Sequence, residues 1–148
     1  MRILVVGAGA VGGYFGGRLL QAGRDVTFLV RPRRAALLAE YGLSIHSPLG
    51  DFHRPAPPTV TADGLVELFD LVILSCKSYD LDGAIASFAK AVGPNTAVLP
   101  LLNGMRQLDV LADRIGGERV LGGQCVISAT LDAKGGVVVC RACSVAWR

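Results

Sequence analysis

The chain has 148 residues, of which 51% are hydrophobic and 18% are charged, and its formal net charge is +3. This length fits one domain of ordinary size, the composition excludes a disordered chain, and the small charge excess argues against nucleic acid or a membrane surface as a partner. No apolar run reaches the roughly 18 residues of a membrane span. Because a strand-like run already begins at Arg2, we expect no signal peptide. We therefore expect a cytoplasmic protein whose 4 cysteines are reduced.

The first part of the chain follows the order strand, glycine turn, helix, strand. Residues 2–6 form a β-branched apolar run that predicts a buried strand. From Val11 onward apolar side chains recur at helical spacing until Gly23, and residues 25–30 predict the next strand. Within about 30 residues, this order is that of one βαβ unit.

A second helix and an irregular stretch come next. Pro32 fits the first turn of a helix that we expect to run to Tyr41. In residues 42–62, short extended pieces flank a turn at 48–51, and the prolines that follow exclude a regular helix or a central strand. We therefore expect a small hairpin or an irregular crossover there.

Strands and helices continue to alternate in the second half. Residues 71–76 are almost continuously apolar, which is typical of a parallel strand covered on both faces. Helical spacing predicts helices over 81–92 and 108–115. A strand is expected at 97–100 and one more within 120–127. The alternation predicts an α/β fold of the Rossmann type, with a doubly wound and mostly parallel sheet.

A glycine-rich turn joins the first strand to the first helix. It consists of Gly7, Ala8, Gly9, Ala10, Val11 and Gly12. This is the dinucleotide fingerprint, in which Gly7 allows a tight turn, Gly9 admits a pyrophosphate and Gly12 lets the helix pack on the sheet. The helix N-terminus offers free N–H groups to the phosphates. A turn that merely connects two elements is the alternative, but the strand–turn–helix context favours dinucleotide binding.

The end of the second strand carries arginines where NAD sites carry an acid. An acid about 20 residues beyond the glycines holds the ribose hydroxyls of NAD, whereas an arginine suits a 2′-phosphate. Here Arg31 takes that place, and a solvated charged loop is the alternative. Arg33 and Arg34 fall in the first turn of the expected helix, where their charge opposes the helix dipole. Cations at this position do not stabilise the helix, but they would bind a phosphate group, so we predict NADP rather than NAD.

With these motifs, the chain resembles the ketopantoate reductase family (2-dehydropantoate 2-reductases) over about residues 1–139. The resemblance rests on the glycine motif, on Arg31, and on three segments further along the chain: Lys77-Ser78-Tyr79, Leu102-Asn103-Gly104 and Val120-Leu121-Gly122-Gly123. It implies an oxidoreductase that uses NADPH to reduce the 2-keto acid 2-dehydropantoate to pantoate, in pantothenate biosynthesis. It also implies that residues 1–139 form the NADP-binding Rossmann domain.

The same resemblance assigns roles to residues at the ends of later strands. Lys77 and Asn103 match family positions at the nicotinamide and substrate end of the cleft, where they would position cofactor and substrate for catalysis. A lysine there can attract a carboxylate, and an amide can donate and accept. From the residues alone, a solvated lysine and an Asn-Gly turn are equally good interpretations. Ala129 falls at a position where the family backbone contacts the cofactor.

Residues 140–148 do not resemble the family, and we expect an atypical tail there. In the family a C-terminal helical domain follows and holds the general-acid lysine, so we expect the chain to lack that domain and to be inactive alone. The sequence is compatible with two interpretations of this chain: a truncated or frameshifted product, and an isolated domain. Uncovered apolar faces would favour a homodimer.

Two alternatives and one cysteine pair complete the sequence analysis. Another NADP-dependent hydroxy-acid dehydrogenase and a non-catalytic dinucleotide-binding module remain alternative functions. Cys140 and Cys143 have the spacing of a zinc or redox pair. Zinc needs two further ligands, and a redox pair is expected at a helix start, so we expect no metal and no redox role. Cys76 and Cys125 lie in apolar runs and are expected to be inert thiols.

Overall fold

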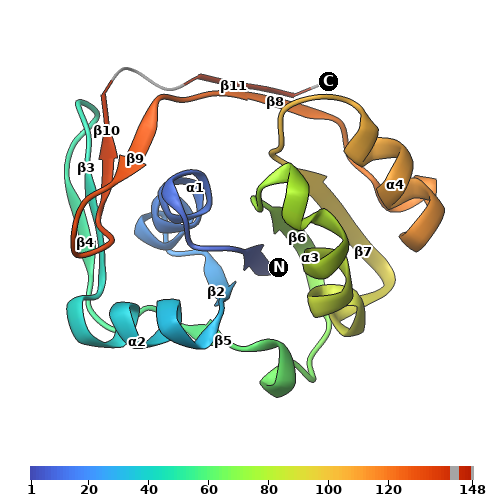
Figure 1. Ribbon diagram of the computed structural model, residues 1–148, viewed down its shortest axis with the longest axis horizontal. Helices are drawn as coiled ribbons and strands as arrows, with labels where there is room; N and C mark the ends of the chain where they lie inside the picture. The colour runs from blue at the N-terminus through green and yellow to red at the C-terminus, as the bar shows by residue number, and fades with distance from the viewer. Residues whose placement is uncertain (141–143, 148) are drawn as a thin grey trace.

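A computed structural model of the chain describes residues 1–140 and 144–147. Its central sheet has five strands: β1 (Arg2–Val6), β2 (Asp25–Leu29), β5 (Thr59–Val60), β6 (Phe69–Leu74) and β7 (Val92–Pro100). Their order is β5-β2-β1-β6-β7, and every neighbouring pair is parallel (Figure 1). The strand order reverses at β1, and ligands of open α/β sheets bind at the carboxyl ends of the strands beside such a reversal.

Helices cover both faces of the central sheet. They are α1 (Ala10–Gln21), α2 (Pro32–Tyr41), α3 (Leu81–Phe88) and α4 (Arg106–Ile115), with shorter 3-10 turns η1 (Ala62–Gly64), η2 (Ser78–Asp80), η3 (Ala89–Ala91) and η4 (Gly117–Arg119). In β1, Ile3 and Val5 belong to the core cluster that includes residues of α1 and α2, whereas Leu4 and Val6 belong to the cluster beneath α3 and α4. Burial on both faces explains why the strands are continuously apolar. The predicted doubly wound, Rossmann-type fold is confirmed.

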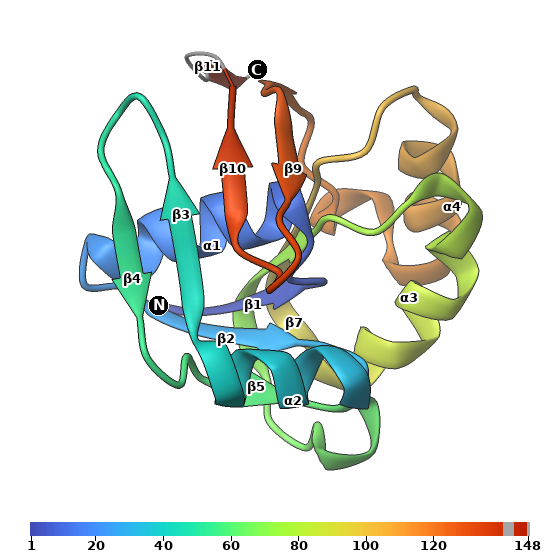
Figure 2. The ribbon, with the colours of Figure 1, turned by 60° about the vertical axis from the view of Figure 1, so that its left-hand side comes forward.

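A second sheet packs against the side of α1 that faces away from the central sheet. Its strands are β3 (Leu43–His46), β4 (Phe52–Arg54), β9 (Ala129–Leu131) and β10 (Val137–Val139), in the order β4-β3-β10-β9 (Figure 2). The β3–β4 hairpin confirms the expectation for residues 42–62. The parallel pairing of β10 with β3 joins this hairpin to the β9–β10 hairpin, which the sequence did not indicate.

Glycines let α1 fit between the two sheets. A Cβ atom at Gly16 would overlap the buried ring of Phe28 in the central sheet. On the other side, a Cβ atom at Gly13 would lie 2.9 Å from a methyl group of Val137 in β10. Real Cβ atoms hardly ever come so close to a neighbour, so the helix can keep this position only because these residues have no side chain.

The structure refines one expectation from the sequence and corrects another. The strand expected within residues 120–127 is present as β8 (Gly123–Val126), but it pairs with β11 (Ser144–Trp147), and the central sheet gains only a single bridge between Val120 and Val98. The helix expected at 81–92 ends at Phe88 because β7 already starts at Val92, where it pairs with Phe69.

Among the described residues, none of the helices combines the length and the hydrophobicity that a membrane span requires.

The packing of α1 predicts opposite effects for one substitution at two helical glycines. Gly16→Ala should lower the free energy of unfolding by about 1–2 kcal/mol, because overpacking against Phe28 outweighs the better helix propensity of alanine. Gly83→Ala in α3 is the matched control, since a Cβ atom there meets nothing within 4 Å among the described residues. It should raise the free energy of unfolding by up to about 1 kcal/mol. Denaturant unfolding measures both, and an unchanged Gly16→Ala protein would contradict the packing argument.

Candidate functional site

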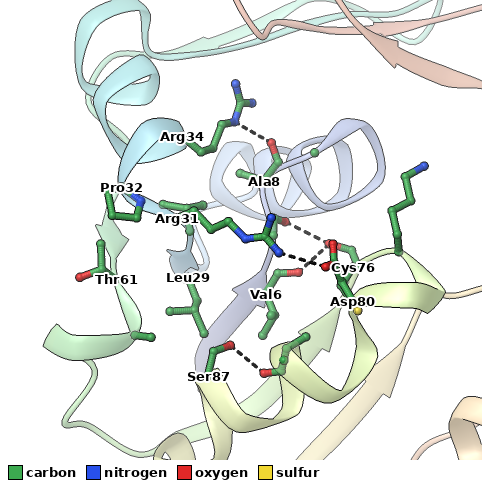
Figure 3. A pocket seen from close by; sticks show the side chains of 18 of the residues that line it. Val6, Ala8, Leu29, Arg31, Pro32, Arg34, Thr61, Cys76, Asp80 and Ser87 are labelled. Carbon is green, nitrogen blue, oxygen red and sulfur yellow. Dashed lines mark hydrogen bonds and ion pairs between the residues drawn. The ribbon is translucent and has the colours of Figure 1, made fainter.

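A pocket of about 480 Å³ opens at the carboxyl ends of β1, β2 and β6 (Figure 3). It therefore occupies the crevice beside β1 where the strand order reverses. The glycine turn, the start of α2, η1, the segment after β6 and α3 all contribute to its walls. The lining residues are Val6, Gly7, Ala8, Gly9, Leu29, Val30, Arg31, Pro32, Arg34, Thr61, Ala62, Asp63, Ser75, Cys76, Lys77, Asp80, Gly83, Ala84, Ser87 and Leu131.

The three glycines of the motif differ in what requires them. Gly7 has a φ of +91°, which favours glycine, and its N–H donates to the carbonyl of Leu29 at 2.9 Å. A Cβ atom at Gly12 would overlap the Gly7 carbonyl oxygen and the Ser75 hydroxyl. Gly9 has an ordinary φ of −76°, and a Cβ atom there would meet no described atom within 4 Å. Folding therefore requires Gly7 and Gly12, while at Gly9 the missing side chain only leaves open space at the pocket.

The N-terminus of α1 adjoins this open space. The first intrahelical bond runs from the N–H of Gly13 to the carbonyl of Gly9 at 2.7 Å, which leaves the N–H groups of Ala10, Val11 and Gly12 without helical partners. The first turn carries no acidic residue that would neutralise the positive end of the helix dipole. Ala10, Val11 and Gly12 do not line the pocket themselves, but they begin the helix that points at it. Backbone donors around open space fit the phosphates of a dinucleotide.

Arg31 and Arg34 both line the pocket, but their surroundings differ. The Arg31 side chain is 81% exposed, and its Nη2 lies 3.1 Å from Oδ1 of Asp80. Arg34 is partly buried; its Nε donates to the carbonyl of Ala8 and its Nη2 to the carbonyl of Gly135, both at 2.9 Å. Burial lowers the pKa of Arg34, and the Asp132 carboxylate partly opposes that shift.

These contacts correct the sequence argument that stability has no use for cations at the start of α2. Arg34 ties the glycine turn to α2 and to the β9–β10 turn, so it has a structural reason to be there. Arg33 is exposed and does not line the pocket. Of the three arginines, Arg31 has the exposure and the position to meet a ligand.

The segment after β6 forms the opposite wall. The Ser75 hydroxyl lies 2.9 Å from the carbonyl oxygen of Val6 and 3.0 Å from that of Gly7, so it donates a hydrogen bond beneath the glycine turn. Lys77 is exposed at the pocket. Burial and the nearby Asp80 carboxylate raise the pKa of Cys76, which keeps it a neutral thiol and agrees with the expected inert role.

Asn103 and Ala129 do not line this pocket. Asn103 is exposed in the loop after β7, and the buried Gln107 side chain fixes that loop by donating to the carbonyls of Leu102 and Gly104. Ala129 lies in β9 opposite Val139 and packs against the core around α1. The roles expected for these two residues and for Lys77 stay predictions.

The sequence did not single out Ser75, Gln107, Asp63 or Asp80. A serine directly after an apolar strand is a weak signal, because the carbonyls of Val6 and Gly7 come near it only in the fold. A glutamine three residues after Gly104 is also a weak signal, because its acceptors are backbone carbonyls, which every residue has. Among the described residues, no group of three His, Cys, Asp or Glu side chains could hold a metal ion. Cys140 is exposed, and Cys143 lies outside the described residues.

Comparison with known proteins gives matches over most of the chain. The family model described as ketopantoate reductase PanE/ApbA matches residues 3–143. An uncharacterized oxidoreductase of Bacillus subtilis, YkpB, is 44% identical over 135 residues, which cover 91% of this chain and 44% of the relative.

Two solved structures share the fold. The 2-dehydropantoate 2-reductase of Geobacter metallireducens is 32% identical with a TM-score of 0.90, over 98% of this chain and 48% of that chain. D-mandelate dehydrogenase, solved as a ternary structure with NADH and anilino(oxo)acetate, is 27% identical with a TM-score of 0.87, over 98% of this chain and 47% of that chain. This chain therefore spans less than half the length of each relative. The family match over residues 3–143 and these likenesses show that the chain belongs to the ketopantoate reductase family of oxidoreductases.

Proposed function

We propose that this chain binds NADPH in the pocket beside β1 and provides the cofactor-binding part of an enzyme that reduces 2-dehydropantoate to pantoate. Gly9 is the observation that carries the proposal. Its backbone conformation suits any residue and its neighbourhood is open, yet it lines the pocket directly before the helix N–H groups that have no helical partner. A reserved space beside backbone donors is what a pyrophosphate requires.

Arg31 supports NADPH over NADH in this proposal. It follows β2 at the position where an arginine accommodates a 2′-phosphate, and its exposed guanidinium can turn toward a ligand in the pocket. A charge-assisted hydrogen bond is worth about 1.5–3 kcal/mol. The two arginines after it contribute less directly, because Arg34 is held by two carbonyls and Arg33 lies outside the pocket.

The residues at the strand ends suit the reduction of a keto acid. When bound, NADPH supplies the hydride for the carbonyl carbon. Lys77, exposed after β6, adds positive charge that attracts the substrate carboxylate. Asn103, after the neighbouring strand β7, adds an amide at the same edge of the sheet. We assign these two residues to positioning, because the family resemblance assigns the general acid to a lysine that does not match any position within residues 1–148.

A second candidate is the reduction of a different 2-keto acid. The likeness to D-mandelate dehydrogenase favours it, because that protein shares the fold of this chain at a TM-score of 0.87 and was solved with NADH. Turnover of a panel of keto acids by the full-length Bacillus subtilis relative would distinguish the two candidates. Cofactor binding without any turnover in that protein would favour a binding module instead.

The first prediction from this proposal concerns cofactor preference. The chain should bind NADPH about ten- to a hundred-fold more tightly than NADH, the factor that corresponds to one charge-assisted bond. Arg31→Ala should remove most of this preference, whereas Arg33→Ala, which changes an exposed arginine outside the pocket, should keep it. Titration by cofactor fluorescence measures both affinities. Equal effects of the two substitutions would exclude Arg31 as the phosphate-binding residue.

The second prediction concerns Gly9. Gly9→Val should abolish NADPH binding, because the branched side chain fills the space that a pyrophosphate needs. The fold should persist, since a φ of −76° suits valine and no described atom lies near the new Cβ atom. Thermal unfolding checks the fold and fluorescence titration checks binding. A folded variant with normal affinity would place the phosphates elsewhere.

The third prediction concerns catalysis by residues 1–148 alone. A positioned general acid typically contributes about 10²–10⁴-fold. If that acid lies outside this chain, NADPH oxidation with 2-dehydropantoate should be at least about a hundred-fold slower than with a full-length relative under the same conditions. Comparable turnover would mean that a group within residues 1–148 provides the proton, with the Lys77 ammonium group as the first candidate.

A further inference from the structure

We propose that Asp80 is a specificity-determining residue that opposes Arg31 and so reduces the preference of the pocket for NADPH over NADH. The inference rests on the proposed function, since it assumes that a dinucleotide occupies this pocket. In an NAD site the acid that holds the ribose hydroxyls lies directly after β2. Asp80 instead follows β6 and reaches the pocket from the opposite wall.

The two side chains meet across the pocket. Arg31 follows β2 and Asp80 ends η2 after β6, so 49 residues separate them in the chain. Both line the pocket, and Nη2 of Arg31 lies 3.1 Å from Oδ1 of Asp80 (Figure 3). The Asp80 side chain is 36% exposed, less than half the exposed fraction of Arg31, so the carboxylate is the less hydrated partner of the pair.

A 2′-phosphate would compete with Asp80 for the same guanidinium. When Arg31 turns to the phosphate it gives up its carboxylate partner, and the Asp80 carboxylate then faces a second anion within one pocket. A ribose hydroxyl, in contrast, can donate a hydrogen bond to a carboxylate. Asp80 therefore disfavours the phosphorylated cofactor and tolerates the unphosphorylated one.

The other charged residues of the pocket do not take over this role. Arg34 donates to the carbonyls of Ala8 and Gly135, and Lys77 belongs to the opposite wall with Asp80. Asp63 also lines the pocket, from η1 beyond the end of β5. Among the described residues, however, Arg31 forms its ion pair with Asp80 and not with Asp63. Because the Arg31–Asp80 pair is largely exposed, solvent screening limits its influence to a few-fold in affinity.

The test compares Asp80→Asn with a matched control. Asp82→Asn removes the same charge two residues further along and breaks a similar exposed ion pair, with Arg114 at 3.2 Å, outside this pocket. Asparagine also keeps a good N-cap residue at the start of α3, where Asp80 makes no side-chain capping bond, so Asp80→Asn should fold. Thermal unfolding without cofactor verifies this for both variants.

The readout is the dissociation constant of NADPH and of NADH, measured by fluorescence titration. Asp80→Asn should tighten NADPH binding about two- to fivefold, the factor expected for an exposed ion pair, and leave NADH binding unchanged or weaker. Asp82→Asn should change neither. In an Arg31→Ala background, Asp80→Asn should lose most of its effect on NADPH, because the guanidinium for which the two anions compete is gone.

Each other result has a distinct meaning. Weaker NADPH binding by Asp80→Asn would show that Asp80 orients Arg31 for the phosphate. An unchanged ratio of the NADPH and NADH affinities would show that Asp80 plays no part in cofactor choice. Either result would overturn this inference and leave the proposed function standing. Failure of the unsubstituted chain to bind either cofactor would overturn the proposed function and this inference together.

Discussion

The close approach of α1 to two sheets at once is the constraint on which the rest of the structure depends. Gly16 faces Phe28 of the central sheet, while Gly13 faces Val137 of the second sheet. At the start of the helix, Gly12 packs against the Gly7 carbonyl, which the Ser75 hydroxyl holds from below. Because these contacts fix the helix along its length, they also hold its N-terminus at the carboxyl end of β1. The position of the proposed phosphate site is thus a consequence of core packing.

Gly9 stands apart from this packing, and the contrast separates folding from binding. At Gly12 and Gly16 a side chain would collide with the protein itself, so selection for stability alone would keep glycine there. At Gly9 neither the backbone conformation nor a neighbour demands glycine, and alanine would even reduce the entropy of the unfolded chain. A residue that costs stability without serving the fold is best explained by a ligand that needs its space.

The sequence predicts what is encoded locally and misses what distant segments build together. Four strands of the central sheet (β1, β2, β6 and β7), the helices and the glycine turn each have a pattern within a few residues, so their existence and order were predictable. The short edge strand β5 (Thr59–Val60) has no such pattern and was not predicted. The second sheet was not, because β10 is a three-residue strand whose partner β3 lies in the first half of the chain. The loop that holds Asn103 was missed for a different reason: it depends on the buried Gln107, whose acceptors are nearby backbone carbonyls without any sequence signal.

Two arginines that are three residues apart show most clearly why composition alone could not assign the site. Arg34 gives its donors to the carbonyls of Ala8 and of Gly135, the latter 101 residues away, and these bonds would have to break before it could hold an anion. Arg31 shares its guanidinium with a partly exposed carboxylate, a partner that can be exchanged at little cost because water solvates both groups. We therefore propose Arg31, whose present partner is weak, as the residue that binds a ligand. Its pairing with Asp80 arises only when β2 and the segment after β6 are brought close together by the fold.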